Sequence, residues 1–91
     1  MTADTLGLVD YIQEFNKEND TDIFIDLEKS HNFENLLGDF LYVKLNIPNM
    51  GNFESLNQKM RKLEAFLTKK LRKHVQNDGW SCGLVVTLED N

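Results

Sequence analysis

The sequence predicts an α+β domain, a two-layer α/β sandwich in which two helices lie on one face of a three-stranded mixed sheet. Two segments repeat apolar residues at helical spacing, and three others alternate apolar and polar residues as strands do. Glycine, asparagine or proline separates these segments. A chain of 91 residues with 41% hydrophobic content is long enough for one domain, residues 1–91, and too short for two.

The first helix is expected to begin after a cap at Asp4 or Thr5 and to continue to about Lys17. Either capping side chain can offer an oxygen to the free N–H groups of the first turn. Apolar residues recur through this segment at the spacing that places them on one helix face, namely Leu8, Ile12 and Phe15.

The first strand is expected from Asp22 to Glu28. Its residues alternate, so that Phe24 and Asp26 take the face opposite the apolar one. The polar connection from Lys29 to Asp39 is expected to hold a short helical turn that Gly38 ends. This turn is predicted to bury three apolar residues in the core: Phe33, Leu36 and Leu37.

The second strand, Phe40–Ile47, shows the clearest alternation of the chain. Phe40, Tyr42 and Lys44 share one face, the apolar residues share the other, and Pro48 ends the strand because it has no N–H for a ladder. The last strand, Trp80–Leu88, is predicted to direct its even-numbered residues inward, Cys82 included.

The second helix is expected from about Phe53 to Gln76, with an apolar stripe formed by Leu56, Met60, Leu63, Leu67, Leu71 and Val75. The element order is therefore α-β-β-α-β, and the second helix should form a right-handed crossover. The last strand then lies either antiparallel beside the first strand or parallel beside the second. A helix of roughly 36 Å would outrun strands of about 26 Å, which raises a homodimer through its overhanging end.

The net charge of −5 conceals an uneven distribution. Residues 1–54 carry 11 acids and 3 bases, whereas residues 55–77 carry 7 bases and 1 acid. The sequence thus describes an acidic body that bears one basic helix. Helical spacing places five of the bases opposite the apolar stripe: Arg61, Lys62, Lys69, Arg72 and Lys73.

Two surfaces are candidates for binding another protein. The sheet face away from the helices carries Phe24, Phe40 and Tyr42 beside Asp26, and aromatic residues on such a face can anchor a partner. Asp20 and Asp22 belong to an acidic segment that could steer a basic partner. The alternatives are that the aromatic face stacks single-stranded bases, that other segments cover it, and that the acids only solvate the surface.

The basic helix supports a second hypothesis, because its five bases could follow the phosphates of a nucleic acid. The alternative is a solvated helix face whose charges pair with the acidic body. Bases near a helix C-terminus also suit the helix dipole.

The sequence indicates no enzyme, cofactor or metal site. Cys82 is expected to pack as a small hydrophobe, His74 lies within the apolar stripe of the second helix, and His31 lies in a loop. The five glycines form no phosphate-binding loop. No signal peptide or long apolar run is present, so we expect a cytoplasmic protein. The favoured hypothesis is a small acidic inhibitor or regulator, of the kind found among immunity proteins and phage inhibitors, that binds a larger protein.

Overall fold

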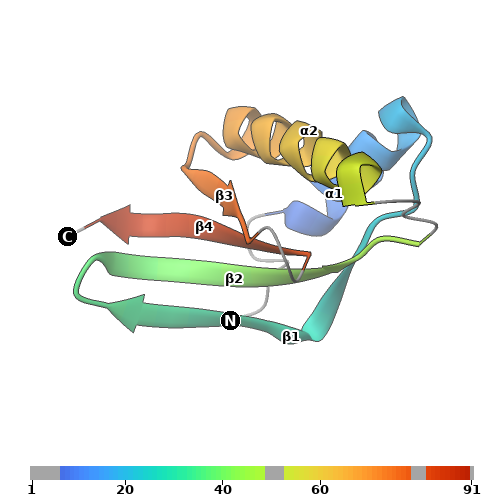
Figure 1. Ribbon diagram of the computed structural model, residues 1–91. Coiled ribbons are helices and arrows are strands. Elements are labelled where there is room, and N and C mark those ends of the chain that lie inside the picture. The colour runs from blue at the N-terminus through green and yellow to red at the C-terminus, as the bar shows by residue number, and fades with distance from the viewer. Residues whose placement is uncertain (1–6, 49–52, 79–81, 91) are drawn as a thin grey trace.

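A computed structural model of the chain describes residues 7–48, 53–78 and 82–90. Its elements are α1 (Leu8–Asn19), β1 (Phe24–Asn35), β2 (Gly38–Asn46), α2 (Phe53–Leu71), β3 (Val75–Asn77) and β4 (Gly83–Asp90). In this described part, four strands form one antiparallel sheet in the order β1-β2-β4-β3. Both helices pack on one face of that sheet (Figure 1).

The α+β class and the two helices on the sheet are confirmed, but the predicted three-stranded mixed sheet is wrong. The cause is the short strand β3, which runs antiparallel to β4 and reverses the chain before β4 begins. As a result β4 returns beside β2 in the antiparallel sense, which was neither of the two expected arrangements. The second helix therefore connects β2 not to the strand beside it but to β3, which runs in the same direction as β2 with β4 between them, and the order is α-β-β-α-β-β.

The predicted end of the second helix is also wrong, because α2 stops at Leu71 rather than near Gln76. Arg72 adopts a left-handed backbone conformation with φ of 55°, and the chain then extends into β3. Val75 was expected to be buried as part of the helix stripe. It is buried, but as a residue of β3 that pairs with Val86 of β4. A 19-residue helix spans about 28 Å. The overhang that suggested a homodimer is therefore absent.

The connection expected to hold a helical turn is instead strand. β1 continues to Asn35, and Leu36 and Leu37 form the turn of a β1–β2 hairpin that closes with Asn35 opposite Gly38. Gly38 has φ of 141°, a backbone conformation that glycine adopts readily and other residues do not. Leu36 and Leu37 are 95% and 72% exposed, so the prediction that they enter the core is wrong.

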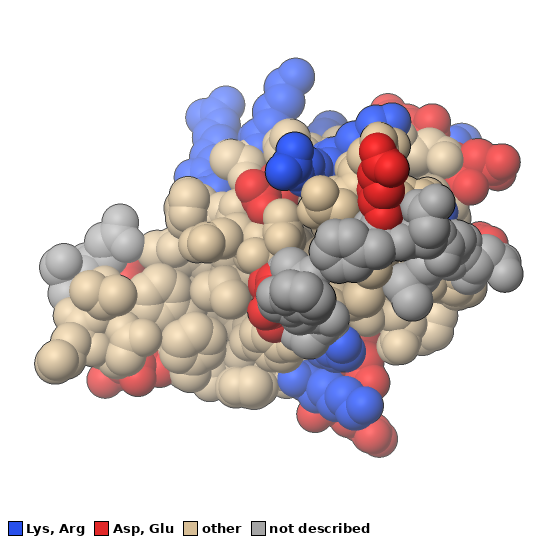
Figure 2. All heavy atoms as spheres, viewed as in Figure 1, with Lys and Arg blue, Asp and Glu red and all other residues tan. Residues whose placement is uncertain are grey.

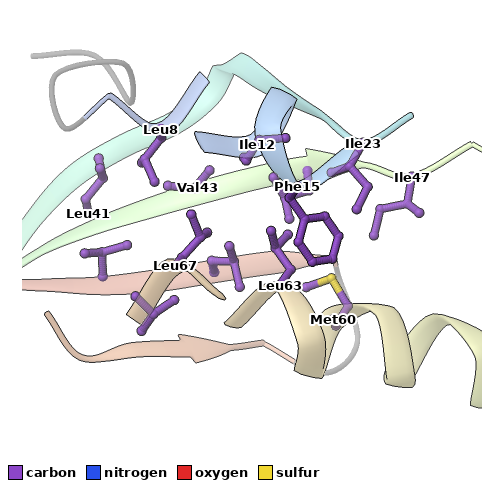
Figure 3. Close-up of a cluster of buried hydrophobic side chains, with 14 residues drawn as sticks. Leu8, Ile12, Phe15, Ile23, Leu41, Val43, Ile47, Met60, Leu63 and Leu67 are labelled. Atoms are coloured by element: carbon purple, nitrogen blue, oxygen red, sulfur yellow. The ribbon is translucent and has the colours of Figure 1, made fainter. Parts of the chain in front are cut away.

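The core lies between the helices and the inner face of the sheet (Figure 3). Leu8, Ile12 and Phe15 of α1 meet the alternate residues of β2 that the sequence placed inward. From α2 come Met60, Leu63 and Leu67, and an edge-to-face contact joins Phe15 to Phe66 at 5.4 Å between ring centroids. The apolar residues that recur at helical spacing in the helices and at alternate positions in the strands therefore form one core.

Side-chain amides and carboxylates fasten both helices to strands. Asn16 of α1 accepts a hydrogen bond from the Ile23 N–H at 2.9 Å and donates to the Ile23 carbonyl at 2.8 Å. In α2, Glu64 accepts hydrogen bonds from the backbone N–H and the side-chain amide of Asn77, at 2.8 and 2.7 Å. These contacts fix the start of β1 and the end of β3.

The caps predicted at Asp4 or Thr5 and the inward placement of Trp80 fall on residues outside the described part of the chain. Within that part, α1 begins after Gly7, which has φ of 74°, and no side chain caps it. No helix formed by the described residues is long and apolar enough to cross a membrane.

Candidate functional site

The face of the sheet opposite the helices, here called the outer face, is the candidate functional surface. Neither α1 nor α2 reaches it, because both lie on the other side of the sheet (Figure 1). From Phe40 to Asn46 the burial of β2 alternates, so the residues between the buried ones belong to this face. Their partners across the sheet complete it: His31 and Phe33 on β1, and Val85 and Thr87 on β4.

Four rings form a compact group on the outer face, which we call the aromatic cluster: His31, Phe33, Phe40 and Tyr42. The Phe33 and Phe40 rings stack at 5.2 Å between centroids with an interplanar angle of 20°. His31 lies 5.5 Å from the Tyr42 ring and 6.2 Å from the Phe33 ring. Direct cross-strand pairing of His31 with Tyr42 and of Phe33 with Phe40 explains this packing.

A bulge in β1 decides which of its residues join the cluster. Asp26 pairs with Lys44, but the next paired residue, His31, lies opposite Tyr42, so the register shifts across residues 27–30. Asp26 organises this bulge, because its Oδ1 accepts hydrogen bonds from the N–H groups of Glu28 and Lys29 at 3.1 and 3.3 Å. Ser30 closes it by donating to the Asp26 carbonyl and accepting from the Lys44 N–H.

Tyr42 rests directly on the backbone of β4. A Cβ atom built on Gly83 would lie 2.6 Å from the Tyr42 hydroxyl oxygen and 2.7 Å from its Cε1. Glycine at position 83 therefore provides the space in which the phenol ring lies. The ring consequently extends from β2 across to the backbone of β4.

The structure brings together only part of the predicted binding set. Phe40 and Tyr42 lie in the aromatic cluster, whereas Phe24, 53% exposed, lies nearer the other end of β1. The carboxylate of Asp26 is turned onto its own bulge. Asp20 and Asp22 are exposed in the α1–β1 loop, where they border a small hollow.

The other two members of the cluster correct the sequence prediction, because His31 was expected in a loop and Phe33 in the core, whereas both lie in β1 on the outer face. Their signal is the alternation His31-Asn32-Phe33, which continues a strand pattern beyond the point at which the first strand was expected to end. The four bulged residues break that alternation, so the two halves of β1 read as unrelated segments.

Beyond the aromatic cluster, the β1–β2 hairpin ends in two exposed leucines, here called the leucine tip: Leu36 and Leu37. The tip lies at the end of the sheet that the helices do not cover (Figure 1). Next to it, three carboxylates stand in register across three strands and form the acidic row: Glu34, Asp39 and Glu89. The row borders a hollow of about 550 Å³.

The five bases predicted opposite the apolar stripe, here called the basic ridge, lie on and just after α2. Arg61, Lys62 and Lys69 are exposed, and basic side chains project from the helix side of the molecule (Figure 2). Lys70, their neighbour on α2, forms an ion pair with Glu14 of α1 at 3.1 Å. Lys73 donates to the Leu88 carbonyl at 3.3 Å.

The cysteine and the histidines lie on separate elements. His31 is in β1, exposed His74 follows α2 instead of lying within it, and Cys82 precedes β4 with φ of 55°. Cys82 packs against the core as a half-buried apolar residue. Among the residues that the structure describes, no group of three or more His, Cys, Asp or Glu side chains is arranged to hold a metal ion.

Comparisons with known protein families, with curated proteins and with solved structures gave no match. The function therefore has to be argued from the geometry of these surfaces.

Proposed function

We propose that this protein is a small acidic interaction module that binds a larger protein target through the outer face of its sheet and thereby inhibits or regulates that target. The observation that carries the proposal is the aromatic cluster, which lies on the face that neither helix covers. The proposed role is non-catalytic and is exercised in the cytoplasm.

The cluster has the properties of a binding anchor. Aromatic side chains bury much apolar area and lose few rotamers on binding, and they are enriched at the energetic centres of interfaces. Stacking of Phe33 on Phe40 and the contact of Tyr42 with Gly83 hold the rings in place before binding. A pre-organised surface loses less conformational entropy when a partner docks.

The charge distribution supports a protein target with a basic surface. The β1 segment and its preceding loop carry Asp20, Asp22, Asp26 and Glu28, with Lys29 as the neighbouring base. Complementary charge around an aromatic centre accelerates association and selects among partners. An acidic module of this size would act by covering a functional surface of its target.

The test is a tagged pull-down from native-host extract, with and without nuclease, using the wild type, Tyr42→Ala and Lys62→Ala. We expect one stoichiometric protein that survives nuclease, is recovered by Lys62→Ala and is depleted with Tyr42→Ala. Once the recovered protein is purified, Tyr42→Ala should weaken its affinity by about 30-fold or more, the size of an interface hot spot. Lys62 is the matched control, since it is exposed on the helix side.

Circular dichroism and thermal unfolding of each variant separate lost binding from lost folding. Unchanged affinity in a folded Tyr42→Ala protein would show that the outer face is not the contact surface. Loss of all recovered proteins on nuclease treatment would favour the second candidate.

That second candidate is nucleic-acid binding through the basic ridge. The observation that favours it is that Arg61, Lys62 and Lys69 form no ion pair with any described residue, contrary to the expectation that the acidic body neutralises them. Unpaired bases along one helix can follow phosphates. The net charge of −5 opposes the approach of a polyanion, so this candidate ranks second.

A further inference from the structure

We infer that the leucine tip inserts into an apolar pocket of the target protein, and that lysine or arginine side chains on the rim of that pocket pair with the acidic row. The inference rests on the proposed function and names the chemistry of the partner. Leu36 and Leu37 would then supply the apolar contact, and Glu34, Asp39 and Glu89 would supply the polar one.

Nothing in the fold of the described residues requires leucines at these two exposed positions. Single exposed apolar residues are ordinary on protein surfaces, but here two adjacent leucines are 95% and 72% exposed at the end of a hairpin. A turn is favoured by Gly, Asn, Asp or Ser, none of which occupies positions 36 or 37. Two leucines at that position therefore point to a contact outside the chain.

The acidic row identifies the partner's charge. Glu34 lies opposite Asp39, and Asp39 lies opposite Glu89, so like charges face each other across three strands. Such pairs destabilise a sheet. No described residue forms an ion pair or hydrogen bond with these three carboxylates. Lys73, the base that contacts β4 nearby, donates to the Leu88 carbonyl instead.

A cation from outside the chain would relieve this repulsion. The hollow beside the row, about 550 Å³ and bordered by Phe33 and Leu88 as well as the carboxylates, has room for the aliphatic stem and charged end of a lysine or arginine. Pairing there places the partner's bases within reach of the leucine tip, because the acidic row is the first full rung of the hairpin behind Asn35 and Gly38.

The same charges argue against two other occupants. The anionic surface of a membrane would repel the acidic row as the leucines approached it. A second copy offers an apolar groove between α1 and β1, but that groove includes Phe24 and Leu27, which the acids Asp22, Asp26 and Glu28 surround in sequence. A protein pocket with a basic rim matches both the leucines and the carboxylates.

The experiment places a diazirine amino acid at position 36 of the full chain and irradiates it in native-host extract. Adducts are mapped by peptide mass spectrometry. We expect adducts on one protein, at an apolar pocket flanked by lysine or arginine. Adducts on lipid or on a second copy, adducts scattered over many proteins, or no adduct at all would overturn the inference.

The mapped protein is then purified and its affinity is measured by calorimetry against matched variants. Leu36→Ser/Leu37→Ser should weaken binding by about 30-fold or more, whereas Leu36→Met/Leu37→Met, which remains apolar, should stay within about 3-fold of the wild type. Glu34→Gln/Asp39→Asn should weaken binding and reduce its dependence on salt.

Tyr42→Ala in the same titrations separates the two proposals. If Tyr42→Ala weakens binding and the serine variant does not, the leucine tip is wrong and the outer face stands. If the serine variant binds as tightly as the wild type and Tyr42→Ala does too, both proposals fail.

Discussion

Three carboxylates in register across β1, β2 and β4 are a residue-scale feature with a measurable effect on stability. Neutralising two of them with Glu34→Gln/Asp39→Asn removes like-charge repulsion and changes side-chain volume little. We expect the free energy of unfolding to rise by about 0.5 kcal/mol at low salt and by less at high salt, where the repulsion is already screened. Urea denaturation at the two salt concentrations measures both values.

This prediction has an opposite sign to the binding prediction for the same variant, and that makes the pair informative. A variant that is more stable but binds less well shows that the acidic row serves an interaction at the expense of the fold. If the stability of the variant equals that of the wild type at both salt concentrations, the carboxylates do not repel each other appreciably.

Individual residues were predictable where one local rule governed them. Phe40 and Tyr42 were placed on the outer face because the alternation of the sequence from Phe40 to Ile47 left no other choice. Leu36 and Leu37 were predicted inward because apolar residues are usually buried, but a hairpin turn places its two central residues beyond the sheet. Hydrophobicity alone could not distinguish a core residue from a contact residue.

At the scale of elements, Glu64 and Asn77 connect α2 to the short strand β3. Glu64→Ala removes the oxygen that accepts two hydrogen bonds and leaves the Asn77 N–H without its partner. We expect a loss of about 1–2 kcal/mol in the free energy of unfolding and faster amide exchange at Val75–Asn77. Hydrogen exchange followed by mass spectrometry or NMR measures the local effect.

Glu64→Gln is the matched variant for this link, because its amide oxygen can still accept a hydrogen bond. Its stability should fall between those of the wild type and Glu64→Ala. Equal exchange rates at β3 in all three proteins would show that apolar packing of Val75, which is 2% exposed, holds this strand without the carboxylate.

The elements that the sequence located well are those with long, uninterrupted periodicity. The first helix, the second helix as far as Leu71 and β2 from Phe40 onward repeat their apolar residues regularly, whereas β3 has only three residues and shows no pattern. β1 was found only as far as its bulge. Paired residue numbers sum to 70 before the bulge, as for Ile25 and Leu45, and to 73 after it, as for Phe33 and Phe40. Because this difference is odd, the two faces of β1 are exchanged at the bulge. Odd-numbered residues such as Ile25 face the helices before it, and odd-numbered residues such as Phe33 lie on the outer face after it.

On the scale of the whole molecule, bases gather on the helix side and acids dominate the remainder of the chain. If the basic ridge binds nucleic acid, affinity must fall steeply with salt, with a slope that counts the phosphates contacted. The triple variant Lys62→Gln/Lys69→Gln/Arg72→Gln should then make the dependence of log affinity on log salt shallower, by about 2 to 3 in slope. Fluorescence anisotropy with duplex DNA and single-stranded RNA over a salt series measures it.

Lys29→Gln serves as the control for these measurements, because Lys29 is an exposed base on β1 and outside the basic ridge. The control should retain the slope of the wild type. If the wild type shows no salt-dependent binding to either nucleic acid, the ridge does not contact phosphates and the second candidate is removed.

The layered architecture was predictable, but the strand order was not. Two apolar helix stripes and an alternating strand require a helix layer on a sheet, whatever the connections. The strand order depends on whether a further strand follows α2 before the last strand begins. That strand is β3, and it has only three residues. Half of the candidate site was predictable in the same way. The alternation of β2 placed Phe40 and Tyr42 in the aromatic cluster, whereas His31 and Phe33 of β1 could be placed there only after the structure showed the bulge.

The bulge at residues 27–30 also determines which kinds of genetic variation this protein can tolerate. Glu28 and Lys29 are exposed and take part in the bulge through their backbone N–H groups, so exchanges of their side chains should be nearly neutral for the fold. A single-codon deletion or duplication there is different, because a one-residue slip of the strand beyond it would turn His31 and Phe33 toward the helix side. Natural variants of this chain should therefore differ at positions 28 and 29 while preserving the length of the segment and Ser30, whose hydroxyl closes the bulge.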